Sequence, residues 1–204
     1  MPDKDLYPNF KALAANEREG IDYQIVIRRQ KTALAVLAPH GGGIEPGTSE
    51  LASALAGEQI SLYLFEGLSS TGSSRLHITS TRFDEPHCLA LLKEVHCVIT
   101  LHGCRSPFPV VFTGGLDQSL QRMVQQALGA AGFLAYPDRR NRRGAHPRNL
   151  CNRGRSGYGL QLELSETLRR RLFSSLDPAG RKQPTPLFHS FNEALLSAVE
   201  SAGW

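Results

Sequence analysis

Apolar and polar positions follow two different periods along this chain, and segments of the two kinds alternate. Short, strongly apolar runs predict strands at residues 23–30, 31–39, 60–68, 95–103, 109–115, 132–136 and 159–165. Helical spacing predicts helices at 48–57, 84–94, 116–132, 166–173 and 189–201. Strands that alternate with helices predict an α/β sheet with helices on both faces. The first two strands, joined by a short turn, resemble a hairpin and therefore favour a mixed sheet.

The ends of two helices carry capping signals. Thr48 or Ser49 is expected to cap the helix at 48–57. Asp84 is expected to cap the helix at 84–94, with Pro86 in its first turn.

Length and composition fit a single domain that comprises residues 1–204. A chain of this length buries roughly 70% of its unfolded surface without disulfides or other staples. Its 41% hydrophobic and 21% charged residues exclude a disordered chain, a collagen-like repeat and a coiled coil. No apolar run approaches the ~18 residues of a membrane span, and the N-terminus has no apolar core of a secretory signal. We therefore expect a cytoplasmic protein with no membrane partner, whose four cysteines are reduced thiols.

The positive charge is concentrated in one stretch. Residues 137–155 hold seven Arg and one Asp, so this stretch contributes +6 to a net charge of +4, and the rest of the chain is slightly acidic. No aromatic residue lies within the stretch, which argues against a nucleic-acid surface. The pattern instead favours a local site for a phosphate or a polycarboxylate. The alternative is a solvated arginine loop without a ligand.

Two histidines and a glutamate follow buried strands. His40 precedes three consecutive glycines, and Glu45 comes just after them. A glycine loop lets the two side chains fold back toward one point. His102 ends a second buried strand, and the carboxyl ends of such strands form the ligand-binding edge of open α/β sheets. Two imidazoles and one carboxylate are the ligand set of a catalytic zinc ion, which makes hydroxide available near neutral pH.

A further carboxylate has the position of a proton carrier. In the strand at 159–165, Glu163 faces away from three leucines that share the other face. It is expected to take a proton from water and pass it to the leaving amine. The alternative is an edge strand with one face in water.

The sequence supports other chemistry less well than this site. Histidines are more often surface or core residues than ligands, so no role is assigned to His77, His87, His96, His146 and His189. Cys104 could compete as a soft ligand, but no second cysteine follows at short spacing. A serine hydrolase would need a G-x-S-x-G turn between a strand and a helix, which the segment at 154–158 does not provide.

Several strings resemble one family. HGGGIEPGTSELA at His40–Ala52 resembles the signature of the poly-γ-glutamate hydrolases, small zinc amidohydrolases of phages and bacteria. Further matches follow in the same order: LHG at 101–103, GGLD at 114–117, NLCNRG at 149–154 and GLQLELS at 159–165. The resemblance implies a zinc-carboxypeptidase-like (phosphorylase/hydrolase-like) mixed sheet with the metal at one edge. It also implies that His40, Glu45 and His102 bind zinc and that Glu163 is the catalytic glutamate.

A weaker resemblance concerns the substrate. Asn152 and Arg153 resemble the Asn-Arg pair with which zinc carboxypeptidases hold a substrate carboxylate. Both are therefore expected to bind substrate, and Arg153 is also expected to stabilise the oxyanion. In carboxypeptidases, however, three positions separate the first His from the Glu, whereas here they are five apart, so exopeptidase specificity does not carry over.

The resulting hypothesis is a Zn²⁺-dependent hydrolase of γ-glutamyl amide bonds in poly-γ-glutamate, a polyanion that the arginine stretch would attract. If the chain comes from a phage, cell lysis would release it. The first alternative is a zinc amidase acting on another acyl substrate, such as an N-acyl amino acid, a peptide or an aminoacyl-tRNA. The second is a non-enzymatic nucleic-acid-binding protein that uses the arginine stretch.

Overall fold

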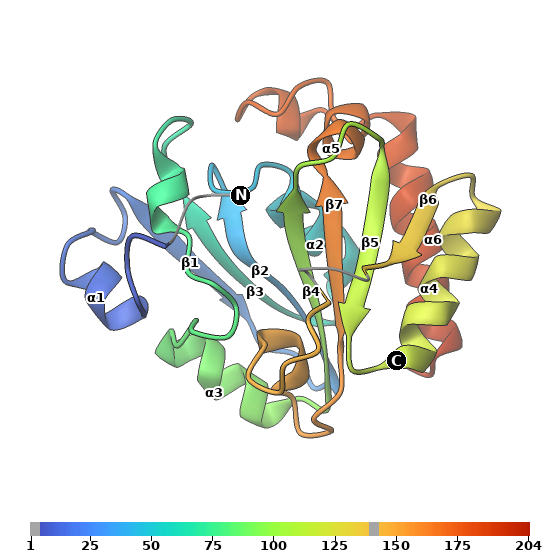
Figure 1. Ribbon diagram of the computed structural model, residues 1–204, viewed down its shortest axis with the longest axis horizontal. Helices are drawn as coiled ribbons and strands as arrows, with labels where there is room; N and C mark the ends of the chain where they lie inside the picture. The colour runs from blue at the N-terminus through green and yellow to red at the C-terminus, as the bar shows by residue number, and fades with distance from the viewer. Residues whose placement is uncertain (1–4, 139–142) are drawn as a thin grey trace.

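The computed structural model describes residues 5–138 and 143–204, and within them seven strands form one mixed sheet (Figure 1). The strands are β1 (Tyr23–Arg28), β2 (Leu34–Gly42), β3 (Ser61–Gly67), β4 (Cys97–Cys104), β5 (Val110–Gly115), β6 (Leu134–Pro137) and β7 (Leu160–Ser165). Their order across the sheet is β1-β3-β2-β4-β7-β5-β6. β1 and β3 are antiparallel, as are β7 and β5, and the other neighbours are parallel.

The helices are α1 (Phe10–Ala14), α2 (Thr48–Ala56), α3 (Pro86–Glu94), α4 (Gln118–Ala130), α5 (Glu166–Leu172) and α6 (Pro186–Ser201). Short 3₁₀ helices lie at η1 (Ser73–Leu76), η2 (Leu150–Asn152) and η3 (Gly180–Lys182). The predicted α/β class, the mixed sheet and the helices on both faces are confirmed. The predicted strands and helices all occur, with ends shifted by a few residues, whereas α1 and the 3₁₀ turns were not predicted.

The predicted hairpin between the first two strands is wrong. β1 pairs with β3, whereas β2 lies between β3 and β4 and is parallel to both. Burial explains the arrangement. Every residue of β2 is buried, so this strand needs neighbours on both sides, whereas β1 alternates between buried and more exposed positions, as an edge strand does.

Two predicted helix caps are also wrong. The carboxylate that accepts from the first backbone N–H groups of α3, at His87 and Cys88, belongs to Glu85, while Asp84 accepts instead from the backbone N–H of Phe10. The cap of α2 is Gly47, which has a φ of 97° and caps without a side chain.

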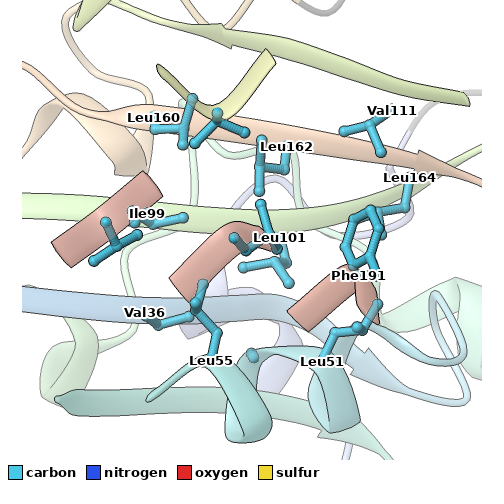
Figure 2. Close-up of a cluster of buried hydrophobic side chains, with 14 of the residues drawn as sticks. Val36, Leu51, Leu55, Ile99, Leu101, Val111, Leu160, Leu162, Leu164 and Phe191 are labelled. Carbon is cyan, nitrogen blue, oxygen red and sulfur yellow. The ribbon is translucent and has the colours of Figure 1, made fainter. Parts of the chain in front are cut away.

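Each face of the sheet has its own apolar core. On one face, α2, α4, α5 and α6 cover leucines and other apolar side chains from β2, β4 and β7 (Figure 2). On the other face, α1, η1 and α3 cover the alternate residues of the same strands, among them Leu37 and Val98. The buried residues Gln161 and Glu163 belong to this second face, because Leu160, Leu162 and Leu164 occupy the first.

Three adjacent parallel strands bring their carboxyl ends to one edge of the sheet. β2, β4 and β7 are neighbours, and His102 is the direct Cα partner of Glu163 across β4 and β7. Polar residues far apart in the sequence therefore meet at this edge. The four cysteines are buried and form no disulfide, as expected for thiols. Within the described residues, no helix is long and apolar enough to span a membrane.

Candidate metal centre

His40 owes its orientation to an irregularity in β2. Between Ala38 and Gly41 the pairing with β3 shifts by one residue, and Pro39, which has no N–H to donate, lies at this point. A Cβ built on Gly41 would meet the side chain of Ser49 in α2, so the neighbouring His40 points to the opposite face. Beyond the irregularity, His40 thus lies on the same face as His102.

The glycine loop then returns Glu45 to His40. The backbone N–H of Glu45 donates to the carbonyl of His40 over 2.8 Å, which closes the turn. Gly43 packs so tightly that a Cβ there would lie 2.0 Å from the carbonyl oxygen of Ser69. The sequence therefore uses glycine where the backbone approaches a neighbouring segment. The result places Oε2 of Glu45 3.3 Å from Nδ1 of His40.

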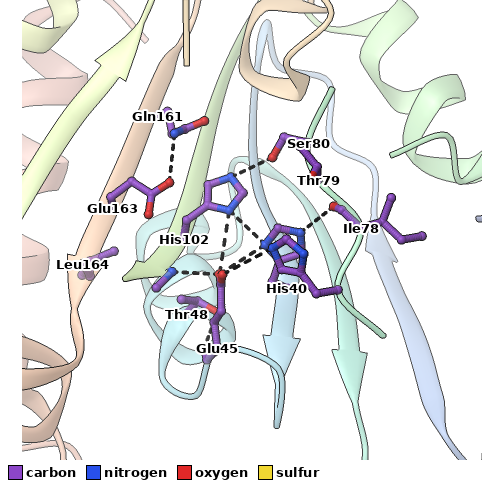
Figure 3. A network of polar contacts seen from close by, with 12 residues as sticks. His40, Glu45, Thr48, Ile78, Thr79, Ser80, His102, Gln161, Glu163 and Leu164 are labelled. Atoms are coloured by element: carbon purple, nitrogen blue, oxygen red, sulfur yellow. Dashed lines mark hydrogen bonds and ion pairs between the residues drawn. The ribbon is translucent and has the colours of Figure 1, made fainter. Parts of the chain in front are cut away.

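The structure brings the three predicted ligands together (Figure 3). Nδ1 of His102 lies 3.1 Å from Nδ1 of His40 and 3.8 Å from Oε2 of Glu45. Zinc bound tetrahedrally at the usual 2.0–2.2 Å would hold its ligand atoms roughly 3.3 Å apart. Two nitrogens and one oxygen at 3.1, 3.3 and 3.8 Å therefore match three corners of such a site.

Hydrogen bonds engage Nε2 of both histidine rings, so the two Nδ1 atoms face each other. Nε2 of His40 lies 2.9 Å from the carbonyl oxygen of Ile78, which can only accept, so Nε2 carries the proton. Nε2 of His102 lies 3.4 Å from Oγ of Ser80, which can accept from it in the same way. Both Nδ1 atoms can then present lone pairs to one point, where a proton or a metal ion must separate them.

The carboxylate of Glu45 is also held in place beside the two rings. The backbone N–H of Gly103 donates to Oε2 of Glu45 over 2.8 Å. Burial by itself would raise the pKa of Glu45, but the adjacent His40 outweighs it and lowers that pKa to about 2. Burial and the proximity of His40 lower the pKa of His102 to about 3. Glu45 is thus anionic and His102 neutral at neutral pH, the forms in which both bind metals. Burial by itself would lower the pKa of His40, but the adjacent Glu45 outweighs it and raises that pKa, so metal binding has to displace a proton shared by this pair.

His77 is a neighbour of this centre that sequence reasoning missed. Its ring packs against His40 with centroids 4.0 Å apart, and its Nε2 lies 4.0 Å from Oε1 of Glu45. His40, Glu45 and His77 could therefore also hold a metal ion. The set that contains His102 is tighter, because the distance from His102 to Oε2 of Glu45 is 3.8 Å and its Nδ1 faces that of His40 directly.

Glu163 is buried beside this centre, with 8% of its surface exposed. Nε2 of Gln161 donates to Oε1 of Glu163 over 3.0 Å, and Nδ2 of Asn149 donates to Oε1 of Gln161 over 2.8 Å. β7 lies between β4 and β5, so the alternative of an edge strand is wrong. The carboxylate projects from the same face as His102 and is fixed by a chain of amides.

Asn152 and Arg153 lie in the arginine-rich stretch, of which residues 139–142 fall outside the described residues. The amide of Asn152 is engaged with backbone: Oδ1 accepts from Leu116, and Nδ2 donates to the carbonyls of Gly144 and His146. A guanidinium N–H of Arg153 donates to the carbonyl of Phe83 over 3.1 Å. Asn152 thus shapes the loop that carries Arg153, and contact of either residue with substrate stays a prediction.

Arg169 of α5 is a second residue that sequence reasoning missed. Its guanidinium is buried and donates to the carbonyls of Leu164 and Pro46. A Cβ on Gly103 would lie 2.8 Å from this guanidinium and 2.9 Å from Cβ of Glu45. Arg169 therefore packs beneath the loop that carries Glu45. Arg169 is one of three consecutive arginines in this helix, so the sequence gives no signal that this one is buried.

Comparison with known proteins identifies relatives of the whole domain. The poly-γ-glutamate hydrolase family matches residues 7–194. The SPbeta prophage-derived protein YoqZ of Bacillus subtilis is 41% identical over 179 residues, which cover 87% of this chain and 65% of YoqZ. YndL of the same organism is 37% identical over 206 residues, which cover 98% of this chain and 79% of YndL. The chain thus spans slightly less than two thirds of YoqZ.

Solved structures lead to the same group. A bacteriophage poly-γ-glutamate hydrolase superposes with a TM-score of 0.95 at 36% identity, covering 98% of this chain and 99% of that chain. A zinc-free form of YndL superposes with a TM-score of 0.93 at 37% identity and the same coverage. An N-formylglutamate amidohydrolase from Ralstonia eutropha shares the fold, with a TM-score of 0.52 at 13% identity over 87% of this chain and 95% of that chain. The chain belongs to the poly-γ-glutamate hydrolase family, as the motifs from His40 to Ser165 indicated.

Proposed function

We propose that this protein is a zinc-dependent hydrolase that cleaves the γ-glutamyl amide bonds of poly-γ-glutamate, with His40, Glu45 and His102 as the zinc ligands. The observation that carries the proposal is the triangle of three ligand atoms at 3.1, 3.3 and 3.8 Å, beside a buried carboxylate. When bound, zinc polarises a carbonyl oxygen and makes hydroxide available near neutral pH. The family and the zinc-free form of YndL support both the metal and the substrate.

Glu163 is the proton carrier in this scheme. Its carboxylate lies on the strand next to His102, and the amide of Gln161 holds one of its oxygens. It accepts a proton from the attacking water and delivers that proton to the nitrogen of the leaving amine. A buried, fixed carboxylate suits this role, because it does not have to reorganise between the two transfers.

Arg153 binds a substrate carboxylate or the developing oxyanion. Its bond to Phe83 uses one N–H of a guanidinium that carries five, so the same group can also bind an anion. Each unit of poly-γ-glutamate carries a free α-carboxylate, so a positively charged stretch beside the site would attract the polymer. This stretch packs directly on Gln161, the neighbour of Glu163, through Gly144 and Asn149.

The test compares two polymers of equal charge. Purified protein, loaded with zinc or stripped by a chelator, is incubated with poly-γ-glutamate and with α-linked polyglutamate, and chain length is followed by size-exclusion chromatography. We expect shortening of the γ-linked polymer that needs zinc and is lost in His102→Ala. Unchanged length of that polymer refutes the proposal. Cleavage of both polymers, or of an N-acyl amino acid instead, supports the alternative of a zinc amidase with another substrate.

A further inference from the structure

A short segment after η1 lies against both histidine rings of the metal centre (Figure 3). The carbonyl of Ile78 accepts from Nε2 of His40 at 2.9 Å, and Oγ of Ser80 lies 3.4 Å from Nε2 of His102. The carbonyl of Ile78 can only accept, so it keeps the proton of His40 on Nε2, and Oγ of Ser80 can accept the proton of His102 in the same way. Each Nδ1 is then available to a metal ion. The position of this segment therefore controls how well the two rings are prepared to bind zinc.

The segment is not held by a helix or a sheet ladder. Residues 77–79 have no regular secondary structure. Turn hydrogen bonds engage the N–H of His77 and the carbonyl of Thr79, whereas the N–H of Thr79 needs a side-chain acceptor. Asp5 fulfils this function. Its Oδ1 lies 2.7 Å from Nδ1 of His77, and its Oδ2 accepts from the backbone N–H of Thr79 at 2.9 Å and from the guanidinium of Arg82. The carboxylate thus binds the residues on both sides of Ile78.

Burial and charge suit Asp5 to this role. Its side chain is 3% exposed, although it lies near the chain terminus. Burial by itself would raise the pKa of Asp5, but the hydrogen bonds from Thr79 and His77 outweigh it and lower that pKa. The group is therefore an ionised acceptor at neutral pH.

We propose that Asp5 is a positioning residue of the metal centre, which sets the zinc affinity by fixing the segment that orients His40 and His102. The inference rests on the proposed function, because it takes these two histidines as zinc ligands. Asp5 precedes residues 7–194, over which the family matches, so the family resemblance does not include it.

The competing explanation is that apolar anchors fix the segment without Asp5. Leu76, Ile78 and Phe83 are fully buried in the core beneath it. These anchors hold the direction of the chain but do not engage the backbone N–H of Thr79 or the ring of His77. Removal of Asp5 separates the two explanations.

The N-terminal segment makes other contacts that do not depend on Asp5. Glu17 binds the guanidinium of Arg75 through two hydrogen bonds of 2.8 and 2.9 Å, and the backbone N–H of Phe10 donates to Asp84 at 2.6 Å. These contacts join the N-terminal segment to the same region of the chain. A change in the zinc affinity of Asp5 variants would therefore not require the N-terminal segment to detach.

The experiment measures zinc affinity of the metal-free protein by competition with a chromogenic chelator, together with its unfolding temperature. The variants are Asp5→Ala, Asp5→Asn and, as a matched control, Asp177→Asn. Like Asp5, Asp177 accepts from backbone N–H groups, in its case those of Ala179 and Gly180 at 2.9 Å each, but it lies in the turn at 177–180, away from the metal centre. Removing groups that orient metal ligands typically weakens metal binding about 10–100-fold. We expect a loss in this range for Asp5→Ala and a smaller loss for Asp5→Asn, which keeps an oxygen that can accept from Thr79.

Asp177→Asn should bind zinc as the wild type does, and the unfolding temperatures of the metal-free variants should change by only a few degrees. Zinc affinity of Asp5→Ala within about twofold of the wild type overturns the inference while the proposed function stands. If both Asp5 variants fail to fold, Asp5 holds the fold and the inference falls as well. A wild-type protein that binds no zinc overturns both the inference and the proposed function.

Discussion

Replacing Glu163 by Gln removes a proton acceptor and leaves the surroundings of the side chain nearly unchanged. Gln has the same shape as Glu and keeps an oxygen that can accept the 3.0 Å hydrogen bond from Gln161. The variant should therefore fold and should bind zinc, since Glu163 is not among the proposed ligands. General acid–base catalysis contributes about 10²–10⁴ in rate, which corresponds to about 2.7–5.4 kcal/mol in the activation barrier. We expect kcat on poly-γ-glutamate to fall by that factor.

The assay follows the initial rate of polymer shortening at saturating zinc, with zinc content measured on the same samples. Glu58→Gln is a suitable control, because it removes a carboxylate of which the side chain is 84% exposed and which lies outside the metal centre. The control should match the wild type. If Glu163→Gln binds zinc and retains kcat within about threefold of the wild type, Glu163 carries no proton and the mechanism is refuted.

The remaining predictions concern the ligands, the glycine loop and acid stability. Elemental analysis should show that His102→Ala no longer binds zinc, whereas His77→Ala still does; the reverse result would assign the metal to the set with His77. Gly43→Ala should destabilise the fold by about 1–3 kcal/mol and weaken zinc binding, because the new Cβ would lie 2.0 Å from a carbonyl oxygen, as thermal unfolding and chelator competition would show. The hydrogen bond from Arg75 outweighs burial and lowers the pKa of Glu17, so the stability it contributes is complete above the ordinary pKa of a glutamate. The difference in unfolding free energy between Glu17→Gln and the wild type should therefore close as the pH falls through the lowered pKa, and a constant difference would contradict it.

The sequence was sufficient to predict most of the fold, because its strands and helices have clear periods. The apolar runs that predicted strands at β2, β4 and β7 are almost entirely buried in the structure. Their burial therefore agrees with the sequence pattern. Pairing was harder to predict. A short turn between β1 and β2 indicated a hairpin, but the burial of β2 on both faces requires it to lie inside the sheet. A short turn in the sequence does not reveal which strands, distant in the chain, pair with each other.

Site residues were predictable where a metal-binding side chain lies at the end of a predicted strand. His40 and His102 were predictable because each lies at the carboxyl end of a buried strand and a carboxylate is near the first. His77 and Asp5 gave no such signal. Both lie outside regular elements, and their contacts join segments more than 70 residues apart in the chain. Residues that orient ligands from loops have no periodicity that a sequence could display.

The strand pattern by itself would have separated the two histidines. Val36 and Ala38 face α2, so regular alternation would send His40 to that face, away from His102. The extra residue of β2 between Ala38 and Gly41 reverses the alternation. Pro39 is the sequence signal for this break, since a proline inside a central strand cannot donate to its ladder. In β2, the proline and the glycines that follow it are thus the sequence sign that His40 points to the opposite face from Val36 and Ala38.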